Sequence, residues 1–119
     1  MIIKERGWSA HYCLANYCLF RRNTLLKNEK YCIVVSTVGN CLKPKSEKIW
    51  KIGIDRYYET MVFHSYEDDN EKYYDADVTR QIYVELPNTI GKENQDYEAN
   101  EMHENVVIEI QQRMIEGTI

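Results

Sequence analysis

The sequence predicts an α+β fold, in which an antiparallel β-sheet fills the first two-thirds of the chain and a carboxy-terminal helix packs on this sheet and on a partner protomer. Three observations predict this fold. Over residues 1–86, segments rich in tyrosine, valine and isoleucine alternate apolar with polar residues, turn-forming residues separate these segments, and residues 94–116 repeat apolar residues at helical spacing. A chain of 119 residues is long enough for one core, so we expect a single domain over residues 1–119.

The first predicted element is a hairpin, with strands at residues 8–14 and 17–26. Its second strand contains two adjacent arginines, Arg21 and Arg22. Neighbouring residues of a strand point to opposite faces of the sheet, so at most one of the two can face the core. The other lies in solvent or against a partner. We therefore treat both as candidate ligand-binding residues, with two solvated surface arginines as the alternative.

A central strand is predicted next, because residues 31–38 form a β-branched run that ends at Gly39. The loop that follows, at residues 41–51, is rich in lysine. Such a loop is either simply solvated or steers an anionic ligand towards the protein.

Two long strands are predicted between Ile52 and Glu85, joined by an acidic turn at residues 67–71. Strict alternation places one arginine on the more apolar face of each strand, Arg56 on the first and Arg80 on the second. A buried guanidinium requires a carboxylate, a phosphate or a subunit boundary, so the pattern indicates a site for an anion. The two faces consist of Ile54, Arg56, Tyr58, Thr60, Val62 and His64, and of Tyr74, Ala76, Val78, Arg80, Ile82 and Val84.

The same two strands allow an enzymatic interpretation. Asp75 and Asp77 place two carboxylates on one strand face, as some acid–base and metal sites require, and His64 is a candidate base. No glutamate or histidine at a fixed spacing accompanies this pair. We therefore expect no catalytic site and no metal site.

The carboxy-terminal helix is predicted to begin with a cap at Asn94 or Asp96 and to end before Gly117. Three apolar residues widen its apolar surface beyond what one small sheet covers, so we expect a homo-oligomer in which helices of two protomers pack together. The main apolar stripe consists of Ala99, Met102, Val106, Ile110 and Met114, and the three further residues are Val107, Ile108 and Ile115.

Positive and negative charges are divided between the two halves of the chain. Residues 1–51 carry a net charge of +7 and residues 52–119 a net charge of −11, for a total of −4. The acidic half argues against binding of long nucleic acid, while the basic half leaves room for a small anion. The amino terminus lacks the apolar region of a signal peptide and no apolar run is long enough to cross a membrane, so we expect a cytoplasmic protein.

Four cysteines occur in the first half of the chain, namely Cys13, Cys18, Cys32 and Cys41. In a secreted protein they could form disulfides, but without a signal peptide we expect buried, reduced thiols. A zinc site with His11, Cys13 and Cys18 as ligands is the alternative, although their spacing differs from the paired pattern of structural zinc sites.

Six phrases of the sequence together resemble one known family. They are Lys4-Glu-Arg-Gly-Trp8, Cys18-Leu-Phe-Arg-Arg-Asn-Thr-Leu25, Ile33-Val-Val-Ser-Thr-Val-Gly39, Asp55-Arg-Tyr-Tyr-Glu-Thr-Met61, Tyr74-Asp-Ala-Asp-Val-Thr-Arg-Gln-Ile-Tyr83 and Ala99-Asn-Glu-Met-His103. In this order they resemble the first-described Thoeris anti-defence family of phages and prophages. The resemblance covers nearly the whole chain except the loops at 41–51, 65–72 and 87–97.

This resemblance implies a non-enzymatic sponge. Members of the family bind the cyclic ADP-ribose isomers (gcADPR) made by TIR-domain defence enzymes, so that the downstream effector receives no signal. Some also sequester cyclic trinucleotides of CBASS at a second site. The family fold is an antiparallel sheet with carboxy-terminal helices, assembled as dimers and as higher oligomers such as a trimer of dimers, with pockets between protomers. We expect no cofactor.

The resemblance also implies ligand-binding residues. Arg56 and Arg113 match the ligand-contacting arginines of the family, Tyr83 stands where the family presents an aromatic ring to a base, and Asn94 lies in the loop that covers the ligand. Two other functions stay open from the residues alone. One is a small nucleotide-hydrolysing enzyme that uses the aspartates and histidine named above, and the other is a phage assembly protein that uses its helix face.

Overall fold

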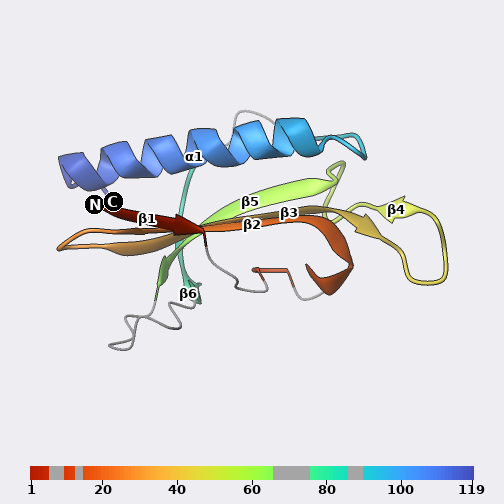
Figure 1. Ribbon diagram of the computed structural model, residues 1–119, viewed down its shortest axis with the longest axis horizontal. Coiled ribbons are helices and arrows are strands. Elements are labelled where there is room, and N and C mark those ends of the chain that lie inside the picture. The colour runs from red at the N-terminus through yellow and green to blue at the C-terminus, as the bar shows by residue number, and fades with distance from the viewer. Residues whose placement is uncertain (6–9, 13–14, 66–75, 86–89) are drawn as a thin grey trace.

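The computed structural model describes residues 1–5, 10–12, 15–65, 76–85 and 90–119, and the predicted α+β architecture is confirmed. In these residues, six antiparallel strands form one sheet and a long helix lies across it (Figure 1). The elements in chain order are β1 (Ile2–Glu5), the short 3-10 helix η1 (Ala15–Tyr17), β2 (Cys18–Lys27), β3 (Cys32–Leu42), β4 (Ile49–Trp50), β5 (Tyr58–Ser65), β6 (Ala76–Ile82) and α1 (Asp96–Glu116).

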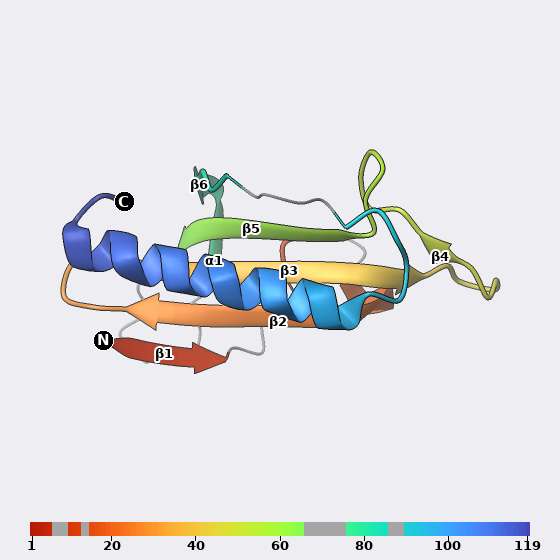
Figure 2. The same cartoon turned by 90° about the horizontal axis from the view of Figure 1, so that it is seen from above.

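Strand β3 lies at the centre of the sheet, as its run of β-branched residues predicts. The strand order is β1-β2-β3-β5-β6, and β4 pairs with the last two residues of β3. All of β3 except Leu42 is buried. The hairpin formed by β3 and β4 projects beyond the start of α1 (Figure 2).

Helix α1 covers one face of the sheet (Figures 1 and 2). Its apolar side packs on the middle strands, and burying each large apolar side chain stabilises the fold by roughly 1.5–3 kcal/mol. The helix ends just before Gly117, as predicted, and Gly117 has a left-handed φ of 70°. The main core consists of Leu26, Ile33, Val35, Val62, Ile82, Val106, Val107, Ile110 and Met114.

The predicted amino-terminal hairpin is wrong. Residues 10–12 are not a strand, and β2 instead pairs with β1 on one side and with β3 on the other. The rest of the predicted first strand, at residues 8–9 and 13–14, lies outside the described residues. On the side where the hairpin was predicted, the partner of β2 is β1, a four-residue strand whose side chains are all exposed, so it lacks the apolar alternation by which a strand is recognised.

The predicted long strands between residues 52 and 85 are only partly correct. Strand β5 begins at Tyr58, and the residues before it form a turn with a positive φ of 53° at Asp55 and a single bridge between Gly53 and Arg56. From Tyr58 to His64 the predicted alternation is confirmed, because Tyr58, Thr60 and Val62 are buried on the helix side. The acidic turn lies outside the described residues.

The second long strand departs from strict alternation. Strand β6 pairs Gln81 with Phe63 and Ala76 with Ser65, so five residues of β6 span the distance of two residues of β5. Because of this irregularity, the side chains of Ala76 and Ile82 belong to different core clusters, and Arg80 is exposed. The prediction that these three side chains share one apolar face is therefore wrong.

The three residues predicted to widen the apolar surface of α1 lie in different environments. Val107 belongs to the main core, whereas Ile108 and Ile115 are exposed. The apolar residues left for a partner are therefore fewer than predicted.

Among the described helices, none combines the length and the apolar character needed to cross a membrane.

Two cysteines depart from the predicted reduced state. Cys18 and Cys41 face each other on β2 and β3 and form a disulfide, so this part of the prediction is wrong. Sequence spacing did not reveal the pair, because the two residues meet only through the antiparallel register. Cys32 is buried in the core as predicted, and Cys13 lies outside the described residues. The disulfide also removes Cys18 from the alternative zinc site.

Candidate functional site

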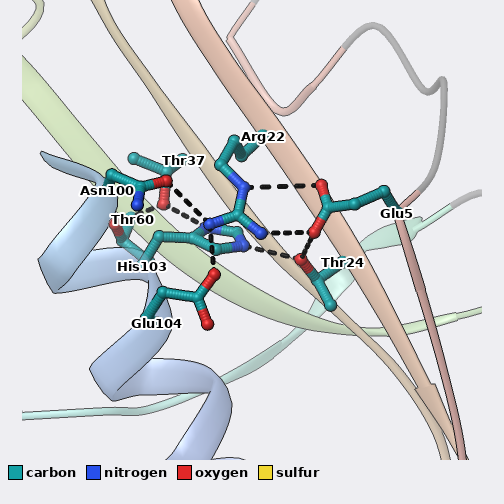
Figure 3. Close-up of polar contacts among 8 residues, drawn as sticks. All are labelled: Glu5, Arg22, Thr24, Thr37, Thr60, Asn100, His103 and Glu104. Carbon is teal, nitrogen blue, oxygen red and sulfur yellow. Dashed lines mark hydrogen bonds and ion pairs between the residues drawn. The ribbon is translucent and has the colours of Figure 1, made fainter. Parts of the chain in front are cut away.

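Arg22 lies between the sheet and α1, where it contacts three side chains of the protein itself (Figure 3). Its Nη2 donates to Glu5 Oε1 at 2.5 Å, and its Nη1 donates to Glu104 Oε1 at 2.5 Å and to Asn100 Oδ1 at 2.8 Å. The Nε lies 3.5 Å from Glu5 Oε2. These bonds use four of the five N–H groups of the guanidinium. Arg22 thus joins β1, β2 and α1, and its charge is balanced by two carboxylates.

Beneath Arg22, His103 is fully buried in a socket of three threonines, one from each of β2, β3 and β5 (Figure 3). Its Nε2 lies 2.7 Å from Thr24 Oγ1 and its Nδ1 lies 2.7 Å from Thr37 Oγ1, which is 2.7 Å from Thr60 Oγ1. Every polar atom of the imidazole therefore has a partner, as a buried polar group requires.

The direction of these bonds follows from the carboxylate at one end. Thr24 donates its hydroxyl proton to Glu5 Oε1 at 2.6 Å, so it must accept the bond from His103 Nε2–H. In the neutral ring Nδ1 is then the acceptor, Thr37 donates to it, and Thr60 donates to Thr37. The chain of bonds runs in one direction from Thr60 to Glu5 and fits a neutral His103.

Burial is the main reason that the pKa of His103 falls to about 4, and the positive charge of Arg22 adds to this shift. The pKa of Glu5 is lowered. Burial alone would raise it, but the bonds from Arg22 and Thr24 outweigh this effect. The polar layer formed by Glu5, Arg22, Thr24, His103 and Glu104 is therefore complete within the protein. We assign it a structural role.

Arg56 is held at the other face of the sheet by Glu59. Its Nη2 donates to Glu59 Oε2 at 2.6 Å, and the other carboxylate oxygen accepts a bond from His11 Nε2 at 2.9 Å. The side chain of Arg56 is 36% exposed, so part of the guanidinium can reach a ligand. Gly53 makes room for this side chain, because a Cβ there would overlap the guanidinium.

The same network continues from His11 to Ser36, whose Oγ lies 2.9 Å from His11 Nδ1. A serine, a histidine and a glutamate in this order match the composition of a hydrolytic triad. However, Ser36 is completely buried in the middle of β3, where no substrate can reach its hydroxyl. The network instead fixes residues 10–12 to the sheet, and the bond from His11 is the main reason that the pKa of Glu59 is lowered.

Asn94 lies just before α1, where its side chain and backbone pair with Asn40 at the end of β3. Asn40 Nδ2 donates to Asn94 Oδ1 at 3.1 Å, and Asn94 N donates to Asn40 Oδ1 at 3.0 Å. The helix begins one residue later than an Asn94 cap would place it: Gln95 is the capping position and makes no side-chain capping bond. The side-chain oxygen and the backbone N–H of Asn94 instead anchor the loop before α1 to Asn40 of β3.

Tyr58 completes this anchor at the start of α1. Its buried ring packs against Phe20, and its hydroxyl donates to Asp96 Oδ1 at 2.5 Å and accepts a bond from Gln95 N at 2.8 Å. Burial and the bond to Asp96 raise the pKa of this hydroxyl. Gly39 faces Tyr58 across the sheet, and any Cβ at that position would collide with the ring.

We expect Tyr58→Phe to lower the free energy of unfolding by about 1–2 kcal/mol, because Gln95 N–H and the Asp96 carboxylate lose their shared partner. Chemical denaturation followed by circular dichroism measures this change. Tyr97→Phe removes a hydroxyl from an exposed tyrosine and serves as the matched control. Equal stability of the two variants would show that the Tyr58 hydroxyl does not anchor the helix.

Arg113 and Tyr83, which are 30 residues apart in sequence, meet near the carboxy-terminal end of α1. Arg113 Nη1 donates to the backbone oxygen of Tyr83 at 3.0 Å, and its Nη2 lies 3.4 Å from Glu109 Oε1. Tyr83 is 77% exposed. A guanidinium therefore lies at the backbone of an exposed tyrosine, and nucleotide sites combine groups of these two kinds.

Arg21 is exposed and points away from α1, since it lies next to Arg22 on the same strand. For the enzymatic alternative, Asp77 accepts two bonds from Thr79, and the pKa of His64 is lowered by burial and by nearby Arg80, while the charge of Asp77 acts in the opposite direction. Asp75 lies outside the described residues.

The predicted ligand-binding residues therefore fall into separate places. Asn94 lies just before α1, and Arg113 and Tyr83 lie near its end, about 25 Å away along the helix at 1.5 Å of rise per residue, whereas Arg56 pairs with Glu59 on the other face of the sheet. The buried residues His103 and Tyr58 were not predicted as polar anchors. A signal for His103 was present, because it follows Ala99 by four residues and precedes Val106 by three, which places it on the apolar stripe.

Comparisons with protein-family models, with curated proteins and with solved structures find no match to this chain.

Proposed function

We propose that this protein binds and sequesters a cyclic ADP-ribose isomer of the gcADPR type, without catalysis, and thereby blocks Thoeris anti-phage defence. The observation that carries the proposal is the pairing of Arg113 with Tyr83. Both were selected from the sequence resemblance, and they lie side by side although they are 30 residues apart. The guanidinium provides charge-assisted bonds for a pyrophosphate, and the exposed ring provides a surface on which adenine stacks.

The pocket in this proposal is shared between protomers. Asn94, just before the start of α1, lies about 25 Å along the helix from Arg113, a distance much longer than a cyclic ADP-ribose. One ligand can therefore contact Asn94 and Arg113 only if the start of α1 in one copy lies close to its end in another. An antiparallel arrangement of two helices places the residues in this way, and the exposed Ile108 and Ile115 are available for such a contact.

Sequestration needs tight binding and no bond cleavage. Arg113 keeps N–H groups beyond the two that bond to Tyr83 and Glu109, and Arg56 is partly exposed. Partial burial of both arginines strengthens their bonds to phosphate relative to bonds made in open water. The nucleotide is then removed from solution, so the downstream effector receives no signal.

The nucleotide released from the protein tests this proposal. The protein is incubated with gcADPR, separated from free ligand, denatured by heat and analysed by mass spectrometry. We expect intact cyclic nucleotide in the released fraction and equal binding in EDTA, since arginines rather than a metal hold the phosphates. A linear product would indicate an enzyme, and absence of any retained nucleotide would favour an assembly protein. A cyclic trinucleotide is tested in the same way as a second ligand.

A matched pair of arginine variants locates the site. Arg113→Ala should weaken gcADPR binding by about ten- to a hundredfold, because it removes a charge-assisted bond. Arg80→Ala removes an exposed arginine of β6 and should leave the affinity unchanged. Isothermal titration calorimetry measures both. Equal affinities of the two variants would exclude the corner formed by Arg113 and Tyr83 as the ligand site.

A further inference from the structure

A basic groove lies at the end of the molecule where the β3–β4 hairpin projects. Its volume is about 620 Å³, within the range of pockets that hold a compact group. Its floor exposes apolar side chains, and Leu19 is 62% exposed. The groove is lined by Asn16, Tyr17, Leu19, Leu42 and residues 43–47.

Positive charge surrounds this groove. Lys43 and Lys45 line it, Lys48 follows in the same hairpin, and Glu47 is the one acidic residue in the lining. In the described part of the chain, no ion pair engages any of these three lysines. The groove therefore combines apolar surface with unpaired positive charge.

The start of α1 has the complementary character. Tyr97 is 84% exposed, which is unusual for a large aromatic residue, and it lies one helical turn before Glu101. Glu93 and Glu98 flank it in sequence and are exposed. Within the described residues, the ion pairs leave these three glutamates unpaired. An open aromatic ring is thus surrounded by negative charge.

We propose that the start of α1 in one copy of the chain docks in the basic groove of a second copy, with Tyr97 inserted between the apolar side chains and with Glu98 and Glu101 facing Lys43 and Lys45. A tyrosine side chain fits the groove, and aromatic residues with matched charges around them are the usual anchors of protein interfaces. None of these five residues is among the predicted nucleotide-binding residues, although Asn94 lies just before the same end of α1.

Charge also favours docking of the start of α1 in the groove of another copy over pairing of the same helix surface in two copies. The surface around Tyr97 carries Glu93, Glu98 and Glu101 and one nearby lysine, Lys92. Two such surfaces placed together would oppose like charges, whereas the groove presents lysines. The division of charge between the halves of the chain, +7 against −11, gives the same preference over longer distances.

Charge exchange between two variants tests the contact. One variant carries Glu98→Lys and Glu101→Lys, and the other carries Lys43→Glu and Lys45→Glu. Each alone opposes like charges at the contact, so its dissociation constant should rise by about tenfold or more relative to wild type. An equimolar mixture restores opposite charges in both orientations and should recover the assembly of the wild type. Light scattering at low salt, without nucleotide, measures the mass of each sample.

Two controls separate docking from general effects of charge. Lys4→Glu with Lys30→Glu makes the same change in net charge as the groove variant, at exposed positions outside the groove, and should keep the mass of the wild type. Tyr97→Ala should reduce the assembly with little change in charge. Melting temperatures confirm that every variant is folded. A monomeric wild type at about 100 µM, a groove variant with unchanged mass, or a mixture that fails to assemble would overturn the proposal.

Discussion

Replacing His103 by alanine is expected to lower the free energy of unfolding by about 3–5 kcal/mol. The substitution leaves a cavity in a closely packed layer, and it removes the partner of two threonine hydroxyls that water cannot reach. The bond between Thr60 and Thr37 also loses its fixed direction, because Thr37 no longer donates to the ring. Urea denaturation followed by circular dichroism measures the loss.

The wild-type protein should also lose stability as the pH falls from about 6.5 to 4. The pKa of His103 is about 4 in the folded protein and 6.5 in a free side chain, so the unfolded chain binds the proton first. The contribution of the neutral ring to the free energy of unfolding is fully present above pH 6.5. About 3 kcal/mol of stability is lost once the pH falls below 4. Arg22, Glu5 and Glu104 are the charged groups that face this ring.

A pair of histidine variants isolates this effect. His103→Leu fills the socket without a titrating group, so the slope of stability against pH between 6.5 and 4 should largely disappear. His64→Ala removes a histidine that is less buried and should keep most of the slope. Below about pH 4.5, Glu5 and Glu59 add their own loss, since their pKa values are lowered in the folded protein. A slope unchanged in His103→Leu would contradict the assignment.

Replacing Arg56 by alanine is expected to weaken gcADPR binding by about ten- to a hundredfold, which corresponds to about 1.5–3 kcal/mol for a charge-assisted bond in a partly buried site. Folding should change little. The Arg56–Glu59 pair is partly exposed, and such pairs contribute about 1 kcal/mol or less. Glu59 also keeps its bond from His11, so its carboxylate is not left alone in the variant.

Lysine at the same position refines the test, because it keeps the charge but cannot form two parallel bonds to a phosphate. Arg56→Lys should therefore bind with an affinity between those of the alanine variant and the wild type. Melting temperature and nucleotide affinity are measured for both variants. If Arg56→Ala melts far below wild type yet binds nucleotide normally once folded, Arg56 supports the fold and does not contact the ligand.

The fold was predictable where burial repeats at a regular interval. The buried strand β3, the alternation from Tyr58 to His64 and the helix with its glycine end all follow from period and from turn residues. The prediction failed for β1, which has no buried side chain, and for β6, where a change of register breaks the period. Both depend on pairing with a neighbouring strand, which local sequence does not encode.

The candidate site was less predictable than the fold, because a residue's partner decides its role. Arg22 and Glu104 are 82 residues apart, so no spacing rule could connect them. Arg56 pairs with Glu59 after a turn that interrupts the predicted strand. Arg113 bonds to the backbone of Tyr83 at the end of α1, and the role of both residues in ligand binding stays a prediction.

The threonine socket of His103 has a further effect on the position of α1 along the sheet. Apolar contacts have no direction, so a stripe that repeats each turn could slide by one turn, about 5.4 Å, and still bury similar side chains. In any shifted position the imidazole and the threonine hydroxyls would be buried without partners, at a cost of about 1–3 kcal/mol for each group. Only one alignment of the helix satisfies all of them. The socket thus determines where Arg113 and the start of α1 lie relative to the strands, and apolar packing alone would not determine this.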